Sequence, residues 1–329
     1  MGGQALSATE IFALVRSELD LVDREISLRS AASVDAITNI SQYLQNGGGK
    51  RIRPTLLLLC SRLVGNGGAA AIRMAAVVEM IHMATLMHDD VIDVAQLRRG
   101  RPSPNVLWGN HTAVLAGDWL YMQAFQVALE ERNFHILNLL ISLTQMMVEG
   151  ELLQLERLGS LAVTESEYMD LVDRKTASLF SACARLGAIT AGASEEAEIR
   201  LGEYAWNLGM AFQLVDDVLD FTAHESVLGK PVGSDLREGK VTLPLIYSLE
   251  KAEESERRMV ETVLRDGNYG RVPFSAILAL TRKYGGIDLA MQRADAFTSQ
   301  ARALLARFPD SCYLRALEKL TDLVTERDH

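Results

Sequence analysis

The chain has 329 residues, a formal net charge of −10 and a pI of about 5.2. This acidity excludes general nucleic-acid binding, although a local basic cluster can still bind phosphates. Hydrophobic residues make up 48% of the chain, prolines number seven, and no Pro/Gly/Ser-rich linker divides it. We therefore expect a single helical domain over residues 1–329 with a large core.

The cysteines and the N-terminus bear on the compartment. Cys60, Cys183 and Cys312 are far apart and odd in number, so neither a disulfide framework nor a zinc site is indicated. The N-terminus lacks the basic and apolar regions of a signal peptide. No run of 18 or more apolar residues occurs, so we expect no transmembrane segment and a cytoplasmic protein.

Apolar residues recur with helical spacing along most of the chain, and no stretch shows strand alternation. The pattern predicts an all-α fold. The expected helices cover residues 7–28, 33–44, 55–63, 74–93, 113–130, 136–158, 165–190, 195–221, 258–264, 274–284, 287–308 and 311–326, and another begins at Thr242.

The stretch from Gly47 to Pro54 reads GGGKRIRP and contains Lys50, Arg51 and Arg53. Glycines let a backbone approach a ligand closely, and a helix start with nearby cations favours phosphate or diphosphate. A Walker A loop is excluded, because its Gly-x-x-x-x-Gly-Lys-Ser/Thr pattern is absent. The alternative is a flexible basic loop without a ligand.

A first carboxylate motif ends the helix expected over residues 74–93. Asp89, Asp90 and Asp93 stand at positions i, i+1 and i+4, so Asp89 and Asp93 share one face. Their mutual repulsion would be relieved by Mg²⁺, which binds one or two carboxylates together with substrate phosphates. The alternative is a solvated acidic helix end. His82 lies two turns earlier and either faces the same cavity or is a core histidine.

A second basic loop follows the motif directly and contains Arg98, Arg99 and Arg101. Arginine recognises phosphate oxygens bidentately, so this loop suits a further anionic group beside the carboxylates. A solvated basic loop is the alternative, and it is weakened by the neighbouring motif.

The carboxylate pattern is repeated at Asp216, Asp217 and Asp220 in another apolar helix. Two copies predict two facing carboxylate walls around one metal–phosphate cluster. The polar loop over residues 222–238 carries Lys230, and Lys240 follows shortly after. Glycines in this region make it a candidate lid.

Together these features indicate diphosphate chemistry that uses no Ser or Cys nucleophile. A diphosphate bound to Mg²⁺ through Asp89, Asp93 and Asp216 would be a good leaving group. Its developing charge would be stabilised by the metal ions and by Arg98, Lys175 and Lys230. A dry apolar cavity would protect the resulting carbocation from water.

The motifs GGKRIRP, HDDVID, LRRG and DDVLD, with Lys240 after the last of them, resemble the trans-isoprenyl diphosphate synthases, or polyprenyl synthetases. The resemblance runs from about Gly47 to Pro244. It implies an all-α bundle around a central catalytic cavity, several Mg²⁺ ions per active site and a homodimer. It also implies head-to-tail condensation of isopentenyl diphosphate with an allylic diphosphate, in which the leaving diphosphate accepts the proton.

The resemblance implies roles by motif position. Isopentenyl diphosphate would be held by Lys50, Arg53, His82 and Arg99. The metal ligands would be Asp89, Asp93 and Asp216, supported by Asp90, Asp217 and Asp220. The allylic diphosphate would be held by Arg98, Lys175, Thr176, Gln213 and Lys230, and Lys240 would belong to a closing lid.

Product length is implied by the residues one turn before the first motif, here Ala84 and Thr85. Short-chain members of the family often carry an aromatic residue there. Small residues would leave the cavity open toward Val77, Met80 and Ile81, and across to Met122 and Phe125. We therefore expect a heptaprenyl to decaprenyl product, with octaprenyl as the single best choice.

Four alternatives stay open at this point. A short-chain farnesyl or geranylgeranyl diphosphate synthase would share every motif. A non-catalytic subunit of a heteromeric prenyl synthase would be expected to lose the carboxylates, whereas this chain keeps all six. A terpene cyclase would not need two basic loops. A metal phosphohydrolase would need further clustered histidines, and the remaining ones are scattered.

Overall fold

The computed structural model describes residues 8–48, 51–222 and 232–325. The chain divides into two compact units, each defined by the contacts within it, and several helices have residues in both units. Unit 1 comprises Met1–Leu143, Leu179–Ala205 and Leu304–Leu320, and unit 2 comprises Thr144–Ser178, Trp206–Ala303 and Thr321–His329.

The described residues are overwhelmingly helical, so the predicted all-α class is confirmed. Unit 1 contains α1 (Ala8–Ala13), α2 (Arg16–Arg29), α3 (Asp35–Gln45), α4 (Ile52–Val64), α5 (Gly68–Ile92), α6 (Pro104–Trp108) and α7 (Asn110–Glu130). Unit 2 contains α9 (Glu165–Val172), the π-helix η1 (Asp173–Ala177), α13 (Ser234–Arg237), α14 (Leu243–Lys251), α15 (Glu254–Asp266) and α16 (Phe274–Lys283). The helices α8 (Phe134–Arg157), α10 (Ser178–Thr190), α11 (Glu195–Thr222), α17 (Gly286–Leu305) and α18 (Cys312–Thr325) have residues in both units.

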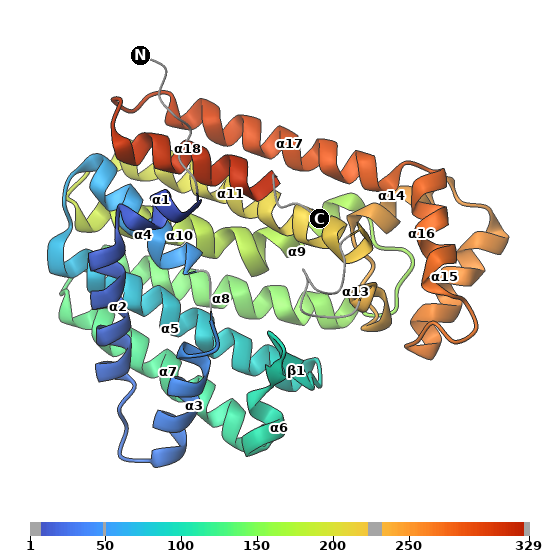
Figure 1. Cartoon of the computed structure of the whole chain (residues 1–329), viewed down its shortest axis with the longest axis horizontal. Helices are drawn as coiled ribbons and strands as arrows, with labels where there is room; N and C mark the ends of the chain where they lie inside the picture. Colours follow the sequence, from blue (N-terminus) through green and yellow to red (C-terminus); the bar gives the residue numbers. More distant parts are fainter. Residues whose placement is uncertain (1–7, 49–50, 223–231, 326–329) are drawn as a thin grey trace. The chain divides into compact units, whose positions relative to one another are not determined.

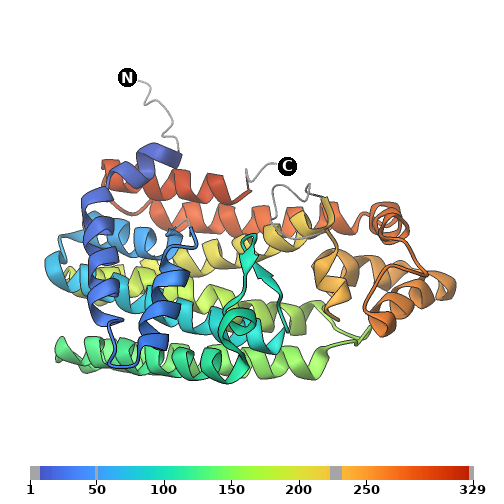
Figure 2. The ribbon, with the colours of Figure 1, turned by 60° about the horizontal axis from the view of Figure 1, so that its bottom comes forward.

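Helix α5 is the centre of unit 1. It is apolar nearly all round, and most of its residues from Met74 to Met87 are buried, as expected for a helix enclosed by others. It packs along α7 and also against α2 and α4. Figures 1 and 2 show α2 and α3, in blue, running across the direction of α5 and α7. The buried helix thus delivers the first carboxylate motif at its C-terminal end.

Three details differ from the sequence-based expectation. The helix expected over residues 7–28 is broken between α1 and α2, where Val15 leaves helical geometry at φ −127° and ψ 21°. Both Ile11 and Val15 are completely buried, so core packing overrides the local periodicity at this break. The stretch 165–190 is not one α-helix, because the π-helix η1 interrupts it. The expected polar loop over residues 222–238 contains the short helix α13 in its described part.

The expectation of no strands was wrong for the second basic loop. Strands β1 (Leu97–Arg98) and β2 (Arg101–Pro102) form a small antiparallel hairpin. Its turn is made by Arg99 at φ 52° and Gly100 at φ 72°. Positive φ at both central residues is what a tight two-residue hairpin turn requires. Strands this short leave no alternation for the sequence to show.

Two helices are long and apolar enough to cross a membrane by length and composition alone, although neither is an unbroken apolar run. They are α5, with 67% of its apolar window buried, and α8, with 28% buried. A core helix of a soluble protein passes the same test, which accounts for α5.

Helices α4 and α10 approach closely within unit 1. A Cβ atom at Gly187 of α10 would lie 2.4 Å from the Leu57 carbonyl oxygen and 3.2 Å from the Cβ atom of Cys60. Only a residue without a side chain fits there.

We expect Gly187→Ala to lower the free energy of unfolding by about 1–3 kcal/mol, the usual cost of overpacking a core. The midpoint of urea unfolding measures this. Gly159→Ala is the control, because nothing lies within 4 Å of its added Cβ at φ +75° and only backbone strain is introduced. A smaller loss for Gly187→Ala than for the control would contradict the close approach.

Candidate active site

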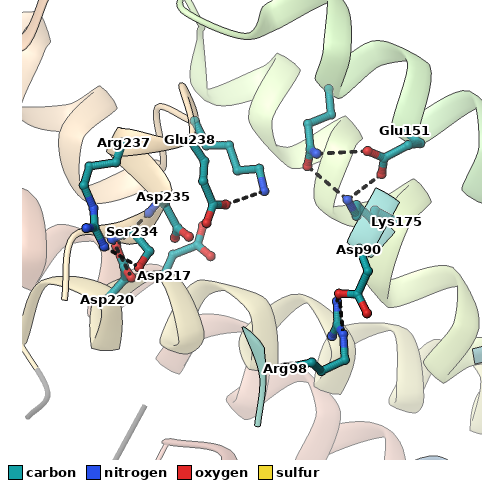
Figure 3. A network of polar contacts seen from close by, with 12 residues as sticks. Asp90, Arg98, Glu151, Lys175, Asp217, Asp220, Ser234, Asp235, Arg237 and Glu238 are labelled. Atoms are coloured by element: carbon teal, nitrogen blue, oxygen red, sulfur yellow. Dashed lines mark hydrogen bonds and ion pairs between the residues drawn. The ribbon is translucent and has the colours of Figure 1, made fainter. Parts of the chain in front are cut away.

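The first carboxylate motif ends helix α5. Asp93 is the C-cap residue, and its N–H donates to the Asp89 carbonyl at 2.8 Å, so the two side chains lie one turn apart. Both are half-buried, whereas Asp90 is completely buried. Burial raises the pKa of Asp90, and the Arg98 guanidinium opposes that rise by donating to its Oδ1 atom from Nε at 2.7 Å and Nη2 at 2.6 Å. Figure 3 shows this pair, which ties the hairpin to α5.

His88, immediately before the motif, lies flat against helix α7. Its Nε2 atom is 3.2 Å from the Val114 carbonyl oxygen and 3.2 Å from Oδ1 of Asp118, and its ring stacks on Tyr121 at 5.8 Å between centroids. A Cβ atom at Gly117 would stand 2.4 Å from His88 Nε2. The imidazole therefore fixes the end of α5 against α7, a role that the sequence analysis did not find.

The predicted basic residues of unit 1 gather around one pocket. Its lining includes Tyr43, Gly47, Arg51, Glu79, His82, Arg98, Arg99 and Arg101. Arg53 joins this group, because its Nη1 atom lies 3.1 Å from His82 Nε2 and its guanidinium lies 5.2 Å from the centre of the Phe180 ring. Lys50, predicted beside them, lies outside the described residues.

His82 is neutral in this setting. Burial, followed by the charges of Arg53, Arg99, Arg98 and Arg51, holds its pKa well below the usual value. A guanidinium can only donate, so Nε2 of His82 accepts from Arg53. The predicted group Arg53, His82 and Arg99 is thus assembled with the chemistry of an anion site.

The second carboxylate motif lies in the unit 2 part of α11. Asp217 is buried and accepts hydrogen bonds from the Tyr168 hydroxyl at 2.5 Å and from Gln213 Nε2 at 2.8 Å. Burial, then Asp235 and Asp216, raises its pKa well above the ordinary value. Asp216 is half-buried.

Asp220 has a different task in the same motif. Its carboxylate accepts from the backbone N–H groups of Ser234 and Asp235, each at 3.2 Å, and its carbonyl accepts from Gly233 at 2.8 Å. It therefore holds the start of α13 and the segment leading to Lys240. Lys240 donates to Glu238 at 2.8 Å, and Lys230 lies outside the described residues.

Lys175 and Thr176 are carried by the π-helix η1, a geometry often found at functional sites. The Lys175 ammonium donates to Glu151 and, at 3.2 Å, to Gln154 Oε1 (Figure 3). The Thr176 hydroxyl donates to Gln213 Oε1 at 2.9 Å. Gln213 thus links Thr176 to Asp217 and uses both ends of its amide on the protein.

The two predicted chain-length residues of α5 differ in burial, because Thr85 is half-buried. Ala84 is completely buried, as are Val77, Met80 and Ile81. The Thr85 hydroxyl donates to the His82 carbonyl at 2.8 Å. The Met122 side chain is 64% exposed in the single chain, so its expected place beside the cavity stays a prediction.

Sequence reasoning missed several supporting residues. Glu79, Glu151 and Tyr168 each hold a predicted site residue or its neighbour. Glu79 gave a signal, since it is a charge inside an apolar helix. Tyr168 gave none, because its hydroxyl meets Asp217 only through tertiary packing.

Among the residues that the structure describes, no three His, Cys, Asp or Glu side chains gather closely enough to hold a metal ion by themselves. Asp89 and Asp93 lie in unit 1 and Asp216 in unit 2, so the predicted metal set stays a prediction. Its chemistry suits Mg²⁺, a hard cation that takes carboxylate oxygens. The three predicted ligands are the half-buried members of their motifs, whereas their three supporting aspartates are buried.

An all-helical chain with two such motifs and an arginine-lined pocket belongs to a class that handles diphosphates. The Polyprenyl synthetase family model matches residues 34–274. Octaprenyl diphosphate synthase of Escherichia coli (strain K12) is 37% identical over 98% of this chain and 100% of that protein. A short chain isoprenyl diphosphate synthase of Methanothermobacter thermautotrophicus is 35% identical over 97% of this chain and 99% of that protein.

The crystal structure of a decaprenyl diphosphate synthase from Rhodobacter capsulatus has a TM-score of 0.93 and 37% identity, with 98% of this chain and 99% of that chain covered. The chain therefore belongs to the polyprenyl synthetase family. The resemblance inferred from its motifs is confirmed, and with it the prediction of a trans-polyprenyl diphosphate synthase at the level of the family.

We expect Gly117→Ala to reduce the catalytic rate about tenfold or more, because the added methyl displaces His88 and misplaces Asp89 beside it; misplacements of about 1 Å can cost 10²-fold. Steady-state turnover checks this. The double variant His88→Ala/Gly117→Ala removes the clash and should regain the melting temperature without regaining the rate. Full activity in Gly117→Ala would contradict the role of His88.

Proposed function

We propose that this protein is a long-chain trans-polyprenyl diphosphate synthase that adds isopentenyl diphosphate units to an allylic diphosphate. The observation that carries the proposal is the division of labour among the six aspartates. In each motif buried members are bound by protein groups, Asp90 by Arg98 and Asp217 by Tyr168, while other carboxylates stay accessible. The arginine-lined pocket supports a second diphosphate beside the one at the carboxylates.

Asp89, Asp93 and Asp216 would hold Mg²⁺, which would neutralise the allylic diphosphate and make it a better leaving group. Arg98, Lys175 and Lys230 would stabilise the negative charge that develops on the leaving oxygen. Lys175 is well prepared for this, because Glu151 and Gln154 fix its ammonium.

Isopentenyl diphosphate would be held by Lys50, Arg53, His82 and Arg99. The bond between the allylic carbon and the diphosphate oxygen breaks, and the double bond of isopentenyl diphosphate attacks the carbon. A proton then leaves to the released diphosphate, so no side-chain base is needed. Positioning of the two substrates accounts for much of the acceleration expected from such a site.

The proposal is tested by product analysis. The protein is incubated with Mg²⁺, farnesyl diphosphate and labelled isopentenyl diphosphate, and the dephosphorylated products are sized by chromatography. A ladder ending between heptaprenyl and decaprenyl, with octaprenyl dominant, is expected. A stop at farnesyl or geranylgeranyl diphosphate would favour a short-chain synthase. No product with intact diphosphate binding would favour a non-catalytic subunit. Activity retained in a chelator would contradict the metal assignment.

Ala84 should gate product length. We expect Ala84→Tyr to shorten the product by several isoprenyl units, because a bulky ring at this completely buried position would obstruct the growing chain. Ala84→Ser is the matched control and should keep the wild-type length. The product ladder measures both, and an unchanged ladder for Ala84→Tyr would remove Ala84 from this role.

We also infer a cytoplasmic homodimer. Helix α7 exposes Leu115, Met122 and Leu129 at intervals of seven residues, with exposures of 66%, 64% and 57%. On α8, Phe134 and Ile141 are likewise seven residues apart and are 80% and 45% exposed. A seven-residue apolar repeat is the pattern of a helix seam, and a second copy can supply the same surface.

The variant Leu115→Glu/Met122→Glu should therefore be a monomer, because two buried charges would face each other across the seam. Light scattering after gel filtration measures the mass. Leu28→Glu, at a position 69% exposed on α2, is the control and should stay dimeric. A dimer that survives the double substitution would place the interface elsewhere.

A further inference from the structure

Arg51 has an unusual backbone. It is the N-cap residue of α4 at φ 48° and ψ 32°, in the left-handed region. Residues with a side chain seldom adopt this conformation, and where they do the surrounding structure must hold it. The turn matters because α4 starts here, and its first turn carries Arg53.

The Arg51 side chain provides that hold. Its Nη1 atom donates to Glu79 of α5 at 2.5 Å, while Nη2 lies 3.0 Å from Oδ1 of Asp23 in α2 and 3.3 Å from the Gln45 carbonyl oxygen in α3. The Glu79 side chain is only 8% exposed and that of Arg51 16%. One guanidinium therefore connects the start of α4 to three other helices.

Helices α4 and α5 are joined by a second contact near the Arg51–Glu79 pair. Glu79 and His82 are three residues apart on α5, so they share a face. Arg51 binds the first of them and Arg53 the second, at 2.5 Å and 3.1 Å. Arg51 is thus committed to the protein, and its conformation sets the direction from which Arg53 reaches His82.

We propose that Arg51 is a positioning residue, whose ion pair with Glu79 fixes the start of α4 so that Arg53 and His82 can hold isopentenyl diphosphate. The proposal rests on the proposed function for the identity of that ligand. It assigns to Glu79, an acid in an anion-binding pocket, the task of holding an arginine rather than contacting substrate.

Two substitutions separate positioning from a simple effect of charge. Glu79→Gln leaves the pocket more positive, so a charge effect would tighten isopentenyl diphosphate binding, whereas loss of positioning would weaken it. Arg51→Gly suits the left-handed backbone and removes only the side chain. We expect each variant to bind isopentenyl diphosphate about tenfold more weakly.

The measurement is calorimetric titration of isopentenyl diphosphate into the full-length protein in a chelator, where the carboxylate motifs are without metal. Turnover assays add the KM split: the KM for isopentenyl diphosphate should rise and that for farnesyl diphosphate should stay. Arg62→Ala is the control, since it removes a comparable pair with Glu18 in the same unit.

Tighter binding by Glu79→Gln, wild-type binding by Arg51→Gly, or equal losses for both substrates would overturn the proposal. If Arg51→Gly does not fold because Glu79 is left buried without its arginine, Arg51→Gly/Glu79→Gln removes that charge and is titrated instead. Should the wild type bind isopentenyl diphosphate but show no turnover, the proposed function fails while the titration still decides the role of Arg51. If the wild-type protein does not bind isopentenyl diphosphate in the chelator, the proposal for Arg51 is overturned.

Discussion

The structure depends on hydrogen-bond and ion-pair partners for the carboxyl groups buried near the ends of apolar helices. Burying an unpaired carboxylate is costly, so each motif needs compensating groups. Asp90 obtains them from Arg98, and Asp217 obtains hydrogen bonds from Tyr168 and Gln213. Asp220 uses backbone N–H groups at the start of α13. These buried members anchor the surrounding loops, while Asp89, Asp93 and Asp216 stay half-buried.

The same logic organises the basic side of the site. The positive charges of clustered arginines would repel one another if every guanidinium pointed into the ligand pocket. The structure distributes them instead: Arg98 pairs with Asp90, Arg51 with Glu79, and Arg53 with a neutral His82. Arg51 and Arg99 both adopt positive φ, at 48° and 52°. Strained backbone of this kind persists where the surroundings over-determine it, often at functional sites.

Packing at glycines makes close alignment possible. His88 lies against α7 only because Gly117 has no side chain, and η1 approaches α8 closely at Gly150. These contacts help to position Asp89 and Lys175, because the preceding residues His88 and Arg174 pack directly against a neighbouring helix. The glycines therefore contribute to the site without any chemistry of their own.

The sequence by itself determined the helical class, most helix positions and the paired carboxylate motifs, because periodicity and i, i+1, i+4 spacing are local properties. Through the family resemblance it also predicted substrate-binding roles for Arg53, His82, Lys175 and Gln213, which stay predictions. It did not reveal the β-hairpin, the break at Val15 or the π-helix at Lys175, where tertiary packing overrides local preference.

Only the tertiary structure decided which aspartates are buried and which partners hold them. Glu79, Glu151 and Tyr168 lie far along the chain from the residues that they bind, so no local pattern could connect them. Met122 has the hydrophobicity of a cavity residue yet is exposed, because the face that a helical residue presents depends on its neighbours in space.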